Sequence, residues 1–316
     1  MAPSNLTRYA ELPVHADNDL GPYLNRSIWI LAVFAGTLLG LRLYSKLYRH
    51  RSLWWDDYIL IAAWVALVAS TSLQSAGIKF GLGKHYEDMQ DKEKVSLFSY
   101  AAGFFSILAT VWSKTSFAVT LLRVSNDRMK WLVWFIIVST NLVLGANAII
   151  QWIQCWPVEK LWHTWIKGRC WSYEIIQDYN IFVAAFSGFV DILLALLPWK
   201  IISPIVTNKR ETIGVLIAMS MGVIAGIVSF LKIRTITSIG DENTTNVSLF
   251  IFGTAEGATS IMAASIPVLR ALIKTNTRSQ DYQDHDRPAS TRVMFRSSTL
   301  SVELESRHND EVDSSK

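Results

Sequence analysis

Several ionisable residues interrupt long apolar stretches of this 316-residue chain, and they are its best candidates for chemistry. They are Asp56, Asp57, Lys114, Asp191, Lys232, Arg234 and Glu256. A charged group inside a lipid bilayer is costly, so such residues normally face the interior of a helix bundle and find partners there. Buried carboxylates can also work as general acids or bases when burial changes their proton affinity. We therefore take Asp57, Lys114, Asp191 and Glu256 as the candidate catalytic residues.

The positions of these residues along their stretches suggest which of them meet. Lys114 lies roughly two-thirds of the way along its stretch, and Asp191 lies just past the middle of its own. Asp57 begins another stretch at the same predicted side. We expect Asp57, Lys114 and Asp191 to converge in the cytoplasmic half of the bundle, with Lys114 paired to a carboxylate. Such a cluster is either a functional site or a structural ion pair that fixes the packing of the helices.

Glu256 lies near the middle of the last apolar stretch. Gly253 and Gly257 are close to its face, and Gly222 and Gly226 give the preceding stretch a similar face of small residues. Small residues let two helix backbones approach closely. We expect the last two helices to pack tightly, with Glu256 directed inward. There it could contact a ligand, carry a proton or hydrogen-bond to a neighbour.

The segments that must position these residues are seven apolar stretches, each about as long as the 20 residues that span a bilayer. They are 26–46, 57–77, 95–121, 131–153, 178–200, 212–236 and 246–272. Charged residues make up only 18% of the chain and there are 13 Trp, which favours a membrane protein. The runs are continuous and lack the alternation of a β-barrel strand. The fold class is therefore all-α: a multi-pass bundle of seven transmembrane helices whose main partner is the lipid bilayer.

This pattern divides the chain into three parts. They are an N-terminal tail at 1–24, a membrane domain at 25–273 and a polar tail at 274–316 that we expect to be disordered. Residues 1–23 contain no apolar core of a signal peptide. The net charge of +4 comes largely from basic residues in loops and tail, which indicates membrane topology and no nucleic-acid partner.

Three features orient the bundle. Cys155 and Cys170 both fall in the loop after the fourth stretch, where a disulfide would indicate an oxidising compartment. Two unpaired thiols are the alternative. Glycosylation sequons at Asn5, Asn243 and Asn246 lie on the same predicted side. Basic residues that follow the first, third, fifth and seventh stretches favour the cytoplasm on the other side. We expect a glycoprotein with its N-terminus outside and its C-terminus cytoplasmic.

The search for cofactor and metal motifs is negative. A retinal Schiff base needs a lysine near the middle of the last helix, and 246–272 contains none. The sequence has no P-loop, GxGxxG, HExxH or GxSxG motif. His50, His85 and His163 lack the spacing of metal ligands. We expect no cofactor, retinal included, and no metal site.

Short motifs along the chain resemble those of a known family. As they stand here, they include Arg51-Ser-Leu-Trp-Trp-Asp-Asp-Tyr, Gly81-Leu-Gly-Lys-His, Lys114-Thr-Ser-Phe, Gln154-Cys-Trp-Pro-Val-Glu-Lys-Leu-Trp, Asp191-Ile-Leu-Leu-Ala-Leu-Leu-Pro-Trp and Ala264-Ser-Ile-Pro-Val-Leu-Arg. Their order and spacing over roughly residues 25–273 resemble the fungal rhodopsin-like domain family, named after a membrane protein of the satratoxin biosynthetic cluster. The resemblance implies a seven-helix fungal membrane protein without a settled activity.

The resemblance leaves two functional hypotheses open. Members of the family occur in gene clusters for specialised metabolites, which implies a mycotoxin-type biosynthetic role with a lipophilic small molecule bound or processed in the membrane. Other members are receptor-like and carry an extracellular cysteine-rich CFEM domain. The residues before 26 contain no Cys, so a receptor-like sensor here would lack that domain. Whether the protein is an enzyme stays open.

Overall fold

A computed structural model describes most of the chain between Leu20 and Ile266. The described residues are 20–48, 53–84, 91–125, 127–163, 165–202, 209–237 and 247–266. They all belong to one structural unit, Met1–Leu269. The tail predicted at 274–316 and nearly all of the tail predicted at 1–24 lie outside the described residues, as do the sequons at Asn5, Asn243 and Asn246.

Seven helices of the described chain are long and apolar enough to cross a membrane. They are α1 (Gly21–Tyr48), α2 (Trp55–Lys79), α3 (Lys92–Val124), α4 (Asp127–Ile153), α5 (Tyr173–Ile202), α6 (Lys209–Thr237) and a seventh helix, Val247–Ile266. The predicted seven-helix bundle is confirmed. The first six helices contain the predicted stretches and extend beyond them, because helices continue into the polar residues at the boundaries.

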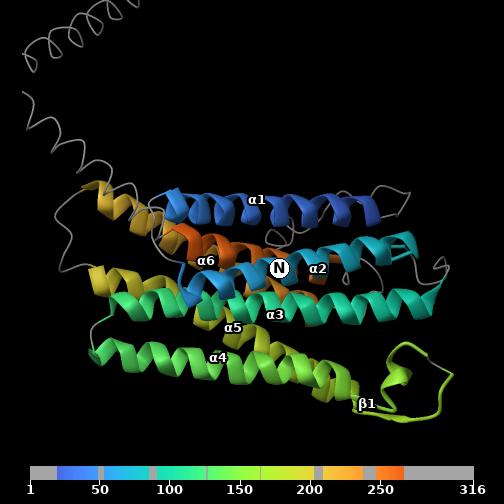
Figure 1. Cartoon of the computed structure of the whole chain (residues 1–316). Helices are drawn as coiled ribbons and strands as arrows, with labels where there is room; N and C mark the ends of the chain where they lie inside the picture. Colours follow the sequence, from blue (N-terminus) through green and yellow to red (C-terminus); the bar gives the residue numbers. More distant parts are fainter. Residues whose placement is uncertain are drawn as a thin grey trace, which may run out of the picture. The chain divides into compact units, whose positions relative to one another are not determined.

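The helices run side by side in the bundle (Figure 1). Among helices α1 to α6, the most extensive pairs are α2 with α3 and α5 with α6. Buried apolar side chains from α1 to α5 and the seventh helix form one core. Large apolar side chains also face outward: Ile30 on α1 and Phe135 on α4 are 61% and 64% exposed. In lipid such side chains are in their preferred solvent, so the exposed apolar faces fit a membrane-embedded bundle.

The glycines of the last two helices do not pack against each other as expected. A Cβ at Gly222 would come within 2.6 Å of Ala195 on α5, and one at Gly226 within 3.0 Å of Ile192. The seventh helix turns its glycines elsewhere: a Cβ at Gly257 would contact Leu67 on α2. The predicted tight packing of helix six on helix seven through glycine is therefore wrong. A small-residue pattern shows that a backbone comes close, but it does not identify that backbone.

A small disulfide-closed loop lies beyond the end of α4 (Figure 1). Strands β1 (Cys155–Trp156) and β2 (Arg169–Cys170) pair antiparallel with Cys155 opposite Cys170, and a 3-10 helix, Val158–Leu161, lies between them. The predicted disulfide Cys155–Cys170 is present. We call this the disulfide end of the bundle. The start of α1 and the end of α2 also lie at this end (Figure 1), where the Leu20 amide donates a hydrogen bond to the Gly83 carbonyl at 3.2 Å. The other end is called the opposite end.

The loop is also attached to the start of α3. Glu93 accepts a hydrogen bond from the Trp165 indole at 3.0 Å and lies 2.8 Å from the imidazole of His163. These contacts fix the loop over the disulfide end. The side chain of His163 is 32% exposed.

Candidate functional site: two buried ion-pair networks

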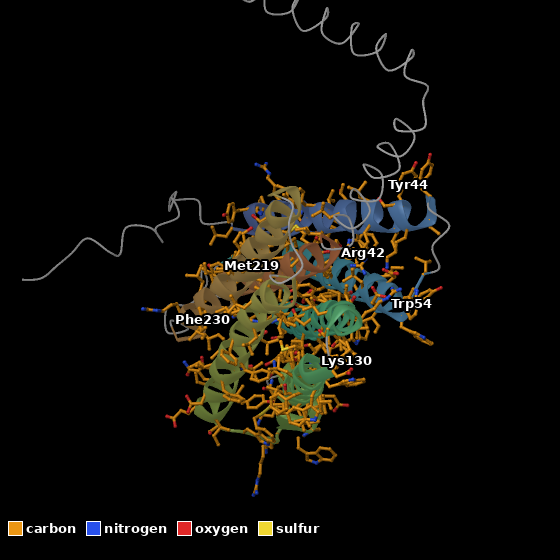
Figure 2. The ribbon with its side chains drawn as sticks, turned by 90° about the vertical axis from the view of Figure 1, so that its left-hand side faces the viewer. Arg42, Tyr44, Trp54, Lys130, Met219 and Phe230 are labelled. Carbon is orange, nitrogen blue, oxygen red and sulfur yellow. A yellow bond between two sulfur atoms is a disulfide. The ribbon has the colours of Figure 1, made fainter. Side chains whose placement is uncertain are left out.

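The first ion-pair network joins α1 to the start of α2 at the opposite end. Arg42 and Lys46 lie one turn apart on α1, so both reach the same neighbour. Arg42 donates to Asp57 at 3.0 Å and to Asp56 at 2.6 Å. Lys46 donates to Asp57 at 2.6 Å. We call Arg42, Lys46, Asp56 and Asp57 the Arg42 network. Arg42 is labelled in Figure 2.

Further hydrogen bonds complete the Arg42 network. The Trp54 amide donates to Asp57 and the Thr120 hydroxyl to Asp56, both at 3.2 Å. Arg42 also donates to the carbonyl of Ala264, in the last described turn of the seventh helix. Carboxylates in the first turn of α2 suit its helix dipole. With two cations, two carboxylates and these extra bonds, the network is balanced in charge.

The second network lies deeper and joins four helices. Lys114 on α3 donates to Asp191 on α5 at 3.0 Å and to Glu256 on the seventh helix at 3.2 Å. The Ser187 hydroxyl donates to Glu256 at 2.5 Å and contacts Lys114 as well. Lys232 on α6 lies 3.5 Å from the other oxygen of Glu256. We call Lys114, Asp191, Glu256 and Lys232 the Lys114 network.

A small cavity borders the Lys114 network. Its volume is about 10 Å³, and its walls are Lys114, Phe117, Asp191, Leu194, Gly222, Ala225, Ser260 and Ala263. Ser260 is 5% exposed, and its hydroxyl has no hydrogen-bond partner. The close approach of α5 and α6 at Gly222 leaves no room for a larger space here.

The two networks test the expected convergence of the candidate residues. The pairing of Lys114 with a carboxylate is confirmed, and Asp191 is one partner. The expected inclusion of Asp57 is wrong: its described ion pairs are with Arg42 and Lys46. The first turn of α2 holds Asp57 at the opposite end, beside the last turns of α1. Glu256 lies beside Lys114 and Asp191 in its place, although it was not predicted to join them.

Sequence reasoning missed several residues of these networks. Arg42 interrupts the first apolar stretch, so its position could have identified it, and Lys46 was interpreted only as a charge that marks topology. Ser187 and Ser260 carried no comparable signal, because serines are common in membrane helices and only their neighbours give them a role. Lys232 was a candidate without an assigned partner.

The boundaries of the bundle carry exposed tryptophans. Trp55 and Trp131, at the opposite end, are 79% and 78% exposed, and Trp156, at the disulfide end, is 81% exposed. Such belts anchor a protein at the two membrane–water interfaces. A surface hollow of about 210 Å³ lies in the first belt, lined by Leu53, Trp54, Trp55 and Tyr58. In the part of the chain that the structure describes, no group of three or more His, Cys, Asp or Glu could hold a metal ion.

Seven spanning helices that expose apolar side chains outward and enclose buried ion pairs define a multi-pass membrane protein. The chain belongs to the fungal rhodopsin domain family, whose model matches residues 41–275. No curated protein and no solved structure matches the chain. The matched range contains every residue of both networks.

Proposed function

We propose that this protein acts in fungal specialised-metabolite biosynthesis of the mycotoxin type, where it binds or processes a lipophilic small molecule in the membrane. The observation that carries the proposal is the Lys114 network, which places two carboxylates and a lysine inside an apolar bundle. In a water-poor site such groups act strongly on a polar group of an otherwise apolar molecule. Asp191 and Glu256 are the candidates for general acid–base work, with Lys114 between them. The resemblance to a family whose members occur in gene clusters for specialised metabolites supports the pathway.

A metabolite could reach the Lys114 network only after the helices move. The cavity of about 10 Å³ accepts a single water and nothing larger. Since α5 and α6 pack closely on each other through Gly222 and Gly226, they would shift as a pair away from α3 and the seventh helix. Such a movement would open the network to the membrane, from which a lipophilic molecule enters.

Deletion of the gene, followed by metabolite profiling under producing conditions, tests this function. We expect loss of one product or accumulation of its precursor, restored by the intact gene. An unchanged profile would reject the biosynthetic role. Complementation with Lys114→Met and with Glu256→Gln should fail to restore the profile, whereas Asp127→Asn should restore it. Asp127 forms only an exposed pair with Lys130, so it is a matched loss of one carboxylate.

We also propose an orientation with the N-terminus outside, the C-terminus in the cytoplasm and glycans at Asn5, Asn243 and Asn246. The disulfide Cys155–Cys170 supports it, because disulfides persist in oxidising compartments. The start of α1 lies at the same end of the bundle as this loop. The Arg42 network would then face the cytoplasmic side.

A receptor-like sensor is the second candidate. The observation that favours it is the linkage of α3, α5, α6 and the seventh helix through one network, because a change at Glu256 would act on all four. The sensor would lie in the plasma membrane and signal through the tail at 274–316. Full function of a chain that ends at residue 273, or a location confined to the endoplasmic reticulum, would reject it.

We propose that the protein binds no retinal. The buried amine of Lys114 lies on α3 and is held by Asp191 and Glu256, so it is not placed as in a retinal protein. Purified protein mixed with all-trans-retinal should show only the absorbance of free retinal. A red-shifted band that disappears in Lys114→Met would contradict this.

A further inference from the structure

The buried centre of the Lys114 network holds more negative than positive charge. The side chains of Lys114, Asp191 and Glu256 are 1%, 5% and 3% exposed, whereas that of Lys232 is 26% exposed. Lys232 also makes the longest contact, at 3.5 Å. Without Lys232, the centre consists of one ammonium and two carboxylates. A buried carboxylate without a countercharge is strongly unfavourable, so the centre needs either Lys232 or a proton.

The two carboxylates differ in how well they are held. Glu256 accepts hydrogen bonds from Lys114 and Ser187 and lies beside Lys232. Asp191 is bound by Lys114, and it borders the cavity. Asp191 is therefore the carboxylate with free space beside it, where a protonated form could donate a hydrogen bond.

The cavity has the size and the partners for one water molecule. A water needs a volume of roughly 10–15 Å³ and usually makes about three hydrogen bonds. The cavity measures about 10 Å³, and its polar walls are Lys114, Asp191 and Ser260. The unpartnered hydroxyl of Ser260, 95% buried, would gain its missing partner. A buried hydroxyl left unpaired is unfavourable.

We propose that the Lys114 network is a proton-binding site in which Asp191 takes up one proton when Lys232 leaves Glu256, while a water in the Ser260 cavity hydrogen-bonds the protonated carboxyl. The proton comes from bulk water, and no bond between heavy atoms forms or breaks. Lys232 has the long stem that allows an ammonium to extend to the boundary of the membrane. Protonation of Asp191 and pairing of Lys232 are thus alternative ways to neutralise the same centre.

The surroundings of Asp191 are consistent with a single exchangeable proton. Among the described side chains, the charged groups that face it are Lys114 from α3 and Glu256 from the seventh helix, with Lys232 of α6 on the far side of Glu256. The described part of α4 contributes no ion pair to it. The proposal goes beyond the biosynthetic role, because it requires no bound metabolite.

Infrared difference spectroscopy of the full-length protein in lipid nanodiscs, recorded across a pH series, tests the proposal. We expect a protonated-carboxyl band that grows as the pH falls and is lost in Asp191→Asn. The surface control Asp127→Asn should keep the band, whereas Glu256→Gln leaves Lys114 paired with Asp191 alone and should shift the band to lower pH. A band that persists in Asp191→Asn, or a folded wild-type protein without any pH-dependent carboxyl band, would overturn the proposal.

Two further variants test the water and the lysine even if Asp191→Asn fails to fold. Ser260→Ala should shift the band in frequency, because the water loses one of its partners. Lys232→Met should move the midpoint of the band to higher pH by about one unit, since the competing cation is gone. Lys130→Met, which removes an exposed lysine, should leave both properties unchanged. An unchanged midpoint in Lys232→Met would refute the competition between lysine and proton.

Discussion

The two ion-pair networks use the same kinds of residues but differ in the completeness of their charge balance. In the Arg42 network, all four charged side chains are at least nine-tenths buried, and hydrogen bonds from Trp54 and Thr120 support the carboxylates. In the Lys114 network, one buried lysine lies between two carboxylates, and the second lysine is partly exposed. The cavity of about 10 Å³ and the unpaired hydroxyl of Ser260 adjoin this second network.

The difference indicates a division of roles. The Arg42 network joins residues that are close in sequence on α1 and α2 and also binds the Ala264 carbonyl of the seventh helix. Its two buried cations and two buried carboxylates balance without a proton, so we assign it to structure. The Lys114 network joins residues 77 and 142 positions apart. It depends on the relative positions of four helices, and a change in any of them alters its charge balance.

The largest effect on stability is expected from a change in the Arg42 network. Arg42→Met should destabilise the fold by about 5 kcal/mol, because it leaves buried carboxylates without a full countercharge. Thermal unfolding in detergent, followed by tryptophan fluorescence, measures this loss. Arg26→Met is the control, since Arg26 is an exposed arginine on the same helix. Equal unfolding temperatures for both variants would contradict the structural role.

Lys114→Met should have a smaller effect, about 3 kcal/mol, because its carboxylates can relieve the penalty by binding protons. The loss should therefore shrink as the pH falls. The double variant Lys114→Met/Asp191→Asn should recover part of the stability of the single variant. Lys94→Met is the control on α3, because Lys94 is exposed and contacts Asp91 and the ring of Phe80, away from the Lys114 network. The same unfolding assay, repeated across a pH series, measures this dependence. A loss of stability that does not change with pH would show that the Lys114 network is structural, like the Arg42 network.

Lys232→Met should destabilise the fold by less than about 1 kcal/mol, since the contact of Lys232 is long and partly exposed to solvent. The same unfolding assay measures it. A loss as large as that of Lys114→Met would show that Lys232 is a permanent member of the centre, which would remove the basis for its exchange with a proton.

The orientation of the two networks can be tested with almost no change in stability. Glycosidase treatment should increase the mobility of the protein on a gel, and Asn5→Gln, Asn243→Gln and Asn246→Gln should each remove part of that shift. Glycans at these positions would place the disulfide end outside and the Arg42 network at the cytoplasmic side. A protein that shows no shift in a glycosylating host would contradict this orientation.

The sequence predicted the bundle better than it predicted the site. Seven stretches were identifiable because apolar runs of this length are a local property, and the pairing of Cys155 with Cys170 followed because the chain has no other cysteine. Lys114 and Asp191 were correctly linked from their depths. Asp57 and Glu256 were misplaced relative to them, since depth alone does not tell which helices are neighbours.

The amino-acid sequence by itself determined that this chain is a seven-helix membrane protein of the fungal rhodopsin domain family with charges that must be buried. Only the tertiary structure decided which charges meet, that glycines of α6 face α5, and that one cavity adjoins Asp191. The reason is geometric. Each residue turns a helix by about 100°, so the sequence fixes which side chains share a face but not which neighbouring helix that face meets. The partner on that face is fixed only when the helices pack.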